Sequence, residues 1–415
     1  MENCRRQILF DPICTCSSVH TDYFQLLNDT IRQLGYRVVS ISALDEFEYR
    51  KASRNKGFRK LKLRLVMYLV FPLKLLVAAV GASRNSLFLI TSNTFYAPLM
   101  VALVGQLRGF RTIQLVYDLF PDAVEVAGGI QTRGLVSRLL GASTRFTRSL
   151  CDACVYLGEF LRAHAETRWG ACRISRAIHI GANMELFENP PNDNNEKPLV
   201  VHYGGQLGYM HDAETLVKCL QCFLGRSDEV MERIRFSFLI SGARSQMFRE
   251  AMATLPIDIG DALPSREWRK RIGEFQIGLV TLSPGGATVC LPSKTYAMMA
   301  GGLAILAICP LWSDLAKVVL DNDAGWVVNN SAFRTVERIA GEEYARQVRK
   351  PRAEEEVIEE FCNILRLVAN RPDLLELKRA NARKAAREAY DQGSLSRDWA
   401  ELISAVKDRG NKSRL

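Results

Sequence analysis

The sequence predicts an α/β protein of two Rossmann-like, doubly wound parallel-sheet domains facing a central cleft, followed by a helical C-terminus. At 415 residues the chain is too long for one ordinary core and indicates two domains. Short apolar runs of strand character alternate with amphipathic helical stretches, as in βαβ units. The alternation stops at a Pro- and Asn-rich stretch, residues 184–198, and then restarts, which indicates a linker.

The first predicted domain covers residues 1–183. Its strands are expected near residues 7–11, 36–42, 86–91, 111–117, 153–157 and 176–180. Helices are expected between them, near residues 20–34, 61–80, 95–107, 133–149 and 158–168.

The second predicted domain covers residues 199–415, after the linker at 184–198. Its strands are expected at residues 199–203, 234–240, 256–260, 277–282, 303–308 and 325–328. From about residue 332 the pattern is helical, and the last helix is a candidate to pack back against the first domain. Open α/β sheets bind ligands at the carboxyl ends of their strands, so the loops after strands are where functional residues are expected.

The net charge of +10 is concentrated in two places. Segment 51–64, KASRNKGFRKLKLR, has seven basic residues and no acid, and the tail 407–415 has four bases against one acid. The rest of the chain is close to neutral. A broad nucleic-acid-binding face is therefore not indicated, whereas one local anionic partner is.

The basic segment runs into the apolar stretch 65–80, LVMYLVFPLKLLVAAV, which Pro72 and Lys74 interrupt. A bilayer span needs about 20 apolar residues with few charges, so this stretch is too short and broken to cross a membrane. A basic run followed by an apolar helix is typical of an element lying on an anionic membrane surface. A core helix behind a solvated linker is the alternative. No secretory signal is recognised at the start, so we expect a cytoplasmic protein, peripheral on the inner face of the cell membrane.

Eleven cysteines in a reducing compartment are expected to be free thiols. Two CxxC pairs, Cys151/Cys154 and Cys219/Cys222, have no further Cys or His cluster to complete a zinc site, so no metal is expected. Residues 14 and 16 are also cysteines and are expected in the loop after the first strand.

Two glycine-containing segments follow strands of the second domain. Gly204-Gly205-Gln206-Leu207-Gly208 precedes a predicted helix at 212–224, and Gly242 and Arg244 lie just after the strand at 234–240. Glycines allow a close approach of the backbone to a ligand, and an Arg can grip a phosphate through two hydrogen bonds. Plain tight turns are the alternative for both segments.

A third segment, LPSKTYAMMAGGLAIL at 291–306, places Pro292, Ser293 and Lys294 at the start of a predicted helix. Proline suits the first turn of a helix, because its missing N–H is not needed there. A diphosphate would be stabilised by the positive helix end and by the Lys294 side chain. This combination is more specific than either glycine segment.

Together these segments resemble the nucleotide-sugar half of a GT-B-type, family-four glycosyltransferase of the bacterial envelope and exopolysaccharide branch. The resemblance is carried by YGGQLGYMHDAETL, FLISGAR, LVTLSPG, LPSKTYAMMAGGLAIL and DAGWVV, and in the first half by VYDLFPDAVEVAGGI and IHIGANMELF. It implies retaining transfer of a sugar from a nucleoside-diphosphate donor, without a required metal or other cofactor. It covers about residues 5–330.

The chain departs from that family at four positions. Gln206 and His211 stand where the family has an Arg and a Lys, and Val289 and Ala297 stand at the two positions of its Glu-x7-Glu pair. The carboxylate that usually binds the ribose and the usual diphosphate clamp are therefore missing.

Two interpretations of this loss remain. Lys294 and Arg244 supply the missing charge, or the donor site is degenerate and the chain is a silent nucleotide-sugar-binding or scaffold subunit. A sugar-nucleotide epimerase of the same architecture is a third possibility. The leading hypothesis is a glycosyltransferase that modifies a lipid-linked or polysaccharide acceptor.

Acceptor-side candidates come from the first half. Asp118 and Asp122, in YDLFPDA after the strand at 111–117, could orient an acceptor hydroxyl or take its proton. Capping of the turn and the following helix is the alternative. His20, expected at the start of the first helix, is a further candidate for contact with the acceptor or a phosphate, and a capping or surface role is the alternative.

Overall fold

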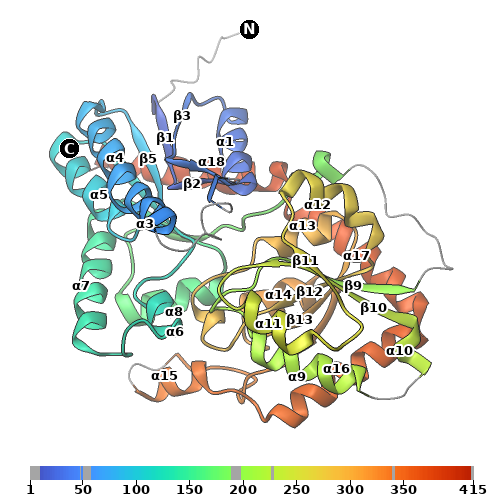
Figure 1. Cartoon of the computed structure of the whole chain (residues 1–415). Coiled ribbons are helices and arrows are strands. Elements are labelled where there is room, and N and C mark those ends of the chain that lie inside the picture. The colour runs from blue at the N-terminus through green and yellow to red at the C-terminus, as the bar shows by residue number, and fades with distance from the viewer. Residues whose placement is uncertain are drawn as a thin grey trace, which may run out of the picture. The chain divides into compact units, whose positions relative to one another are not determined.

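The computed structural model describes residues 10–46, 48–49, 58–187, 198–225, 229–338 and 342–412. The chain forms two compact units, which are taken separately (Figure 1). Unit 1 contains Met1–Pro121, Gln131–His179 and Gln392–Leu415, and unit 2 contains Asp122–Ile130 and Ile180–Asp391. Residues 122–130 fall within the first predicted domain but belong to unit 2. Residues 392–415 fall within the second predicted domain but belong to unit 1.

Unit 1 is built on a six-stranded parallel sheet with strand order β3-β1-β5-β6-β7-β8. Its strands are β1 (Ile13–Cys16), β3 (Val38–Ile41), β5 (Leu87–Thr91), β6 (Arg111–Val116), β7 (Ala153–Tyr156) and β8 (Ser175–Ala177). A separate two-stranded sheet pairs β2 (Val19–His20) with β4 (Leu44–Asp45).

Helices cover both faces of this sheet because successive side chains of each strand point to opposite faces. Leu87 and Leu89 of β5 belong to one core, and Phe88 and Ile90 to the other. The first core packs against α1 (Asp22–Gln33) and the C-terminal α18 (Gln392–Lys412), which lie side by side. The second packs against α4 (Phe71–Gly81) and α5 (Ala97–Arg108). Helix α7 (Leu135–Leu150) packs on α5, and α8 (Glu159–Trp169) on α7.

The apolar stretch 65–80 is part of one continuous helical segment, which corrects the expectation that it is broken. α3 (Phe58–Leu65), a π-helical turn at Val66–Val70 and α4 follow each other without interruption. Leu61–Gly81 is long and apolar enough to cross a membrane by length and composition alone. Pro72 follows the π turn and has no N–H to donate to the preceding turn. The helix nevertheless continues, because the carbonyls left without a donor accept hydrogen bonds from other residues. Thr94 Oγ1 donates to the carbonyl of Met67 at 3.1 Å, and the Tyr96 hydroxyl donates to the carbonyl of Tyr68.

Unit 2 is built on a second six-stranded parallel sheet, with strand order β11-β10-β9-β12-β13-β14. Its strands are β9 (Leu199–Gln206), β10 (Ile234–Ser241), β11 (Asp258–Asp261), β12 (Ile277–Thr281), β13 (Ala304–Ile308) and β14 (Gly325–Val328). The predicted strands of this half are present, and β9 runs three residues further than expected.

The helices of unit 2 again flank the sheet. On one side α9 (Ala213–Leu224) packs with α11 (Ser245–Met252) and α16 (Glu354–Asn370). α13 (Lys294–Ala300) packs with α17 (Pro372–Ala389), which also contacts β13. The remaining helices are α6 (Asp122–Val126), α10 (Glu229–Arg233), α12 (Ser265–Arg271), α14 (Asp314–Asp321) and α15 (Glu342–Arg349).

The start of the chain differs from the sequence expectation. Cys14 and Cys16 lie inside β1, which covers Ile13–Cys16, and both are buried, so they are not loop residues. Burial raises the pKa of both thiols, which keeps them protonated. Parts of four predicted segments lie outside the described residues: 7–9 of the first strand, 51–57 of the basic segment, 188–197 of the linker and 413–415 of the basic tail.

Candidate functional site

The two glycine segments of unit 2 lie side by side, because β9 and β10 are neighbours that end at the same sheet edge. The register pairs Gly204 with Leu239 and Gln206 with Ser241. Beyond the strands, the Leu207 N–H donates to the carbonyl of Ser241 at 2.7 Å, and the Arg244 N–H donates to the carbonyl of Leu207 at 2.9 Å. Sequence-distant segments thus form one wall at the carboxyl edge of the sheet.

Glycine is required at two of these positions. Gly242 has φ +105, and a Cβ there would meet the carbonyl oxygen of Leu207 at 2.9 Å. A Cβ at Gly204 would come within 2.9 Å of both His202 Nε2 and Trp268 Nε1, which are hydrogen-bonded to each other. These glycines are therefore needed for close backbone packing in this wall, as well as for any approach of a ligand.

Lys294 lies in the same unit, as the first residue of α13. Helix α13 begins there, so Pro292 and Ser293 precede the helix, where Pro292 had been expected in its first turn. The Lys294 Nζ is 3.4 Å from the centroid of the Tyr203 ring, and it is buried without a hydrogen-bond partner. Burial lowers the pKa of this amine well below its usual value.

His211 is enclosed in the same cluster. Its Nδ1 accepts a hydrogen bond from the Gly208 N–H at 3.0 Å, and its ring contacts Tyr203 edge-on with centroids 6.3 Å apart. Burial, together with repulsion by a charged Lys294, lowers the pKa of His211 to about 3. At neutral pH His211 therefore carries no charge, and only Lys294 can supply a cation inside this cluster.

The other donor-side candidates are more exposed. The Gln206 side chain lies at the exposed end of β9. The Arg244 guanidinium packs over the Tyr209 ring at 5.4 Å and lies 3.4 Å from Glu214 Oε1. With 39% of its side chain exposed, Arg244 keeps donors free for a ligand.

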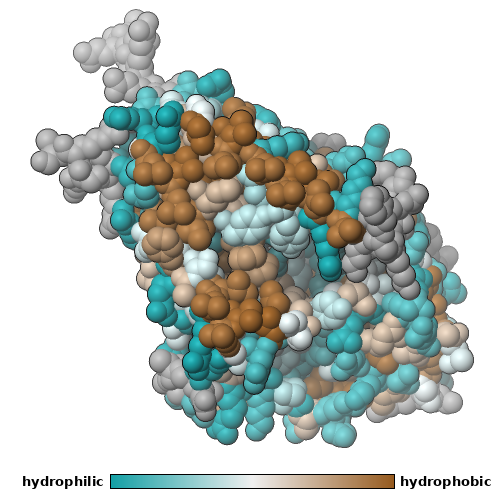
Figure 2. Space-filling model, turned by 60° about the vertical axis from the view of Figure 1, so that its left-hand side comes forward, coloured by the Kyte–Doolittle hydropathy of each residue, from teal (hydrophilic) through white to brown (hydrophobic). Residues whose placement is uncertain are grey.

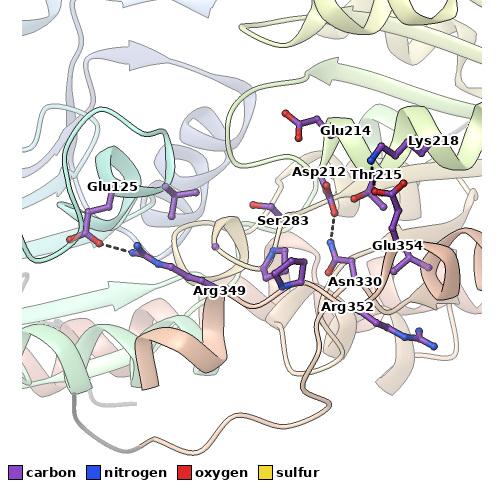
Figure 3. A pocket seen from close by; sticks show the side chains of 15 residues that line it. Glu125, Asp212, Glu214, Thr215, Lys218, Ser283, Asn330, Arg349, Arg352 and Glu354 are labelled. Atoms are coloured by element: carbon purple, nitrogen blue, oxygen red, sulfur yellow. Dashed lines mark hydrogen bonds and ion pairs between the residues drawn. The ribbon is translucent and has the colours of Figure 1, made fainter. Parts of the chain in front are cut away.

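A pocket of about 510 Å³ opens within unit 2, beside the loop that follows β12 (Figure 3). Asn330, after β14, donates to Asp212 Oδ2 at 2.7 Å and to the carbonyl of Leu282 at 2.8 Å. Its own Oδ1 is buried without a partner. At the other end Arg349 donates to Glu125 Oε2 at 2.6 Å, and the Glu125 side chain is fully buried.

Sequence reasoning missed these pocket residues. Asp212 and Asn330 follow strands of the predicted sheet by a few residues, which is a usable signal for a polar site at the carboxyl edge. Arg349 has no such signal, because it comes from a helix far along the chain that pairs with Glu125 only in the folded unit.

Unit 1 has its own cluster at the carboxyl edge of its sheet. Asp118 follows β6, and Ser92, after β5, donates to the backbone carbonyl of Asp118 at 2.8 Å. The residue as a whole is partly exposed, yet burial of its carboxyl raises the pKa of Asp118 to about 6. The ring of Tyr23 packs edge-on against Tyr117, and burial, with a smaller contribution from the charge of Asp118, raises the pKa of Tyr23 to about 12.

The other two acceptor-side candidates are placed differently. His20 lies in β2 and not at a helix start, and its Nε2 is 3.0 Å from Gln25 Oε1. Asp122 is buried in the first turn of α6. Asp118 belongs to unit 1 and Asp122 to unit 2, so the two carboxylates are not members of one cluster within a unit.

Neither CxxC pair is part of a metal centre among the described residues, where no group of three or more Cys, His, Asp or Glu side chains could hold an ion. Cys219 and Cys222 lie on α9, as the helical pattern indicated.

Comparisons with known proteins agree on the architecture, although no family model matches the chain. A probable glycosyltransferase, WbjE of Pseudomonas aeruginosa, is 23% identical over 303 residues, which are 70% of this chain and 73% of that protein. HepE of Anabaena, solved in complex with UDP, has a TM-score of 0.62 at 11% identity and covers 95% of this chain and 100% of its own. Sucrose-phosphate synthase of Thermosynechococcus elongatus has a TM-score of 0.65 at 13% identity, with 96% and 100% covered.

These likenesses confirm the fold class predicted from the sequence. The chain has two parallel-sheet α/β domains and a helical C-terminus, and both solved structures are similar to it over nearly its whole length. The chain therefore has the GT-B glycosyltransferase fold.

Proposed function

We propose that the chain is a retaining GT-B glycosyltransferase of the family-four, envelope-polysaccharide type. It transfers a sugar from a nucleoside-diphosphate donor to a lipid-linked or polysaccharide acceptor at the cytoplasmic face of the membrane. The similarity to WbjE and the UDP bound by HepE support a sugar-nucleotide substrate. The motifs of the second half support the same substrate.

The buried amine of Lys294 is the observation that carries the proposal. An amine without a hydrogen-bond partner, whose pKa is lowered by burial, is costly to keep in a folded protein unless a ligand uses it. A donor diphosphate beside Nζ would supply the missing partner and favour the protonated form. Lys294 would then stabilise the charge that develops on the leaving group, in place of the cations lost at Gln206 and His211.

Gly204, Gly205 and Gly242 would let the donor approach the backbone, and Arg244 would hold its phosphates from the exposed side. Pro292 and Ser293 would fix the turn that leads to Lys294. In the reaction the bond between the sugar anomeric carbon and the diphosphate breaks, and the nucleoside diphosphate leaves with the electron pair. The acceptor oxygen forms the new bond to that carbon.

Asp118 is the candidate to receive the proton of the acceptor hydroxyl. Its pKa of about 6 leaves the carboxyl mostly ionised at neutral pH, while its affinity for a proton is higher than that of an ordinary carboxylate. His20 and Asp122 are proposed to contact the acceptor. The proposed chemistry needs no metal or other cofactor.

The test is release of nucleoside diphosphate from a panel of UDP-, GDP- and dTDP-sugars, compared between the wild-type chain and Lys294→Ala. Wild type should turn over one donor class, and Lys294→Ala should lose that turnover by orders of magnitude. Lys317→Ala, an exposed lysine of α14 in the same unit, is the matched control and should behave as wild type. Equal turnover in all three proteins would remove Lys294 from the donor site.

The chain also lacks the family's paired carboxylates, and this observation favours a second candidate function. Val289 is fully buried, and position 297 is an alanine, so neither offers an acceptor to a ribose. A silent nucleotide-sugar-binding subunit would bind a donor, detectable by calorimetry, and release no diphosphate in the presence of any acceptor. Turnover of a single donor at a steady rate rules this candidate out.

A further inference from the structure

Three neighbouring helical segments of unit 1 expose large apolar side chains. α4 packs on α5, and α5 packs on α7, so the segments form one layer on one side of the sheet (Figure 1). The exposed apolar residues are Leu61, Leu65, Tyr68, Leu69, Leu73, Val77 and Val80 of the α3–α4 segment, Leu103 and Leu107 of α5, and Leu135, Val136, Leu139 and Phe146 of α7. We call this set the apolar face. Figure 2 shows brown residues gathered over this side of the molecule.

The α3–α4 segment has two opposite apolar sides. Phe71, Leu75 and Ala79 are fully buried in the core beneath it. Leu61, Leu65, Leu69, Leu73 and Val77 recur every four residues and are exposed, Val77 by 74%. A surface helix of a globular protein usually has a polar outer side, and an exposed apolar side of this extent is typical of an interaction surface.

The segment is tied to the unit by more than this burial. The carbonyls of Met67 and Tyr68 in its π turn accept hydrogen bonds from Thr94 and Tyr96, which precede α5. A helix that crossed a bilayer would need lipid or other helices on all sides, and it would have to give up the core contacts of Phe71 and Leu75. The attached geometry therefore favours a helix that lies along a membrane over one that spans it.

α5 and α7 extend the apolar face beyond the segment that the sequence pattern indicates. Leu107 is 87% exposed and Leu139 is 63% exposed, and Leu135, Leu139 and Phe146 recur at helical spacing along one side of α7. Nothing in the composition of α7 marks it as a membrane element, because it is interspersed with Arg, Ser and Thr. Only its position in the layer shows that its apolar side continues the face.

The charge around the apolar face has one sign. The sequence contains no Asp or Glu from residue 58 to residue 117, nor from residue 131 to residue 150. Exposed bases lie among the apolar side chains: Lys62, Arg64, Lys74, Arg108, Arg138 and Arg145. Such a surface complements anionic lipid headgroups. A second copy of the same face would bring like charges together, which disfavours self-association through it.

We propose that the apolar face, including α5 and α7, is a monotopic docking surface for an anionic lipid bilayer, on which the α3–α4 segment lies in the plane of the membrane. This inference extends the membrane location in the proposed function, and it does not depend on the donor site. The leucines of the three helical segments insert among the acyl chains, while the bases contact the headgroups.

The experiment is flotation of the full chain with vesicles of phosphatidylcholine alone or with phosphatidylglycerol added. Wild type should float with the anionic vesicles, and less so at high salt. Leu135→Gln/Leu139→Gln on α7 should lower the partition coefficient by at least about tenfold, because two leucines lose their apolar burial. Leu377→Gln, a 50% exposed leucine of α17 in unit 2, is the matched control and should float as wild type does.

A second variant tests the electrostatic part. Arg138→Gln/Arg145→Gln should weaken binding to anionic vesicles, by about tenfold, and should leave binding to neutral vesicles unchanged. All substituted residues are exposed, so thermal melting should match that of wild type, and diphosphate release from the free donor should be retained. A chain that floats but turns over no donor would overturn the proposed function alone.

Three outcomes would overturn the proposal. If the α7 double variant floated as wild type does, α7 would not be part of the docking surface. Wild type that resists extraction by salt and alkaline carbonate, and needs detergent, would be a spanning protein. A dimer in sedimentation that the α7 variant dissociates, without vesicle binding by wild type, would assign the face to a second copy.

Discussion

The two sheets carry opposite ionisable groups beyond the carboxyl ends of their strands. In unit 2 the order of the parallel strands reverses between β9 and β12, and Lys294 lies after β12 with its amine buried. In unit 1 the reversal lies between β1 and β5, and Asp118 follows β6, the next strand in the sheet. Burial shifts both pKa values toward the neutral form, downward for Lys294 and upward for Asp118.

The buried amine of unit 2 and the buried carboxyl of unit 1 indicate which kind of group each unit is suited to bind. A buried amine gains most from an anion, because the anion favours its protonated form. A buried carboxyl gains most from a hydroxyl whose proton it can share. Donor phosphates and acceptor hydroxyls have these two chemistries. The shared architecture does not decide this assignment, because both sheets have the same layers and similar strand order.

Lys294→Met should give the largest effect. The substitution keeps the length of the side chain and removes its charge, so kcat/KM for the donor should fall by about 100- to 1,000-fold, as for loss of one preorganised charge partner of a leaving group. Steady-state kinetics at saturating acceptor would measure this. Lys317→Met is the control. A Lys294→Met enzyme with unchanged kcat/KM would show that Lys294 does not act on the donor.

Asp118→Asn should come next. Removal of a general base should lower kcat/KM by about 100-fold, at the low end of what such groups contribute. In wild type kcat/KM should rise with pH and level off above about 6, where the carboxyl of Asp118 loses its proton. The variant should lose this limb of the pH profile. If Asp118→Asn kept both the rate and the limb, Asp118 would be a structural residue of its loop.

The stability of the same two variants should depend on pH in opposite ways. The folded protein raises the pKa of Asp118 from 3.8 to about 6, so wild type loses stability as pH rises between these values. The free energy of unfolding of Asp118→Asn should therefore increase relative to that of wild type as pH rises, by at most about 3 kcal/mol. Burial lowers the pKa of Lys294, so wild type loses stability as pH falls below about 10.4, where the unfolded chain binds the proton. The stability of Lys294→Met relative to wild type should therefore increase as pH falls.

Urea unfolding of both variants and wild type at about pH 4, about pH 6 and about pH 8 would measure the difference. Gly242→Ala provides a control of another kind, since the clash with the carbonyl of Leu207 should destabilise it at every pH. Parallel pH dependence of the two charge variants would mean that burial does not set both pKa values.

The sequence predicts most of the sheet framework because buried parallel strands are continuous apolar runs between helical patterns. β5 and β13 are examples, each buried along its whole length. Local pattern fails where one residue is judged alone. Pro72 suggested a break, but the hydroxyls of Thr94 and Tyr96 take over the carbonyls that the helix leaves unpaired. Cys14 and Cys16 look like loop residues and are strand residues.

The candidate site was predictable only in part. Gly204, Gly242 and Lys294 follow strands that the pattern identifies, so their shared edge could be foreseen. The burial of the Lys294 amine against Tyr203 could not, because it brings together a side chain of β9 and the first residue of α13, which are 91 positions apart. The pairing of Arg349 with Glu125 joins residues 224 positions apart and has no local signal.

Arg244→Gln should give the smallest effect, and it separates a buried cation from an exposed one in the same half. Arg244 already packs over Tyr209 and lies near Glu214, and water screens its charge, so an added phosphate contact should be worth little. We expect KM for the donor to rise by about three- to tenfold with little change in kcat, and the increase should shrink at high salt. Steady-state kinetics at low and high salt, with Arg249→Gln as a matched arginine on the neighbouring helix α11, would check this. A loss in kcat as large as that of Lys294→Met would show that Arg244, and not the buried amine, provides the charge at the leaving group.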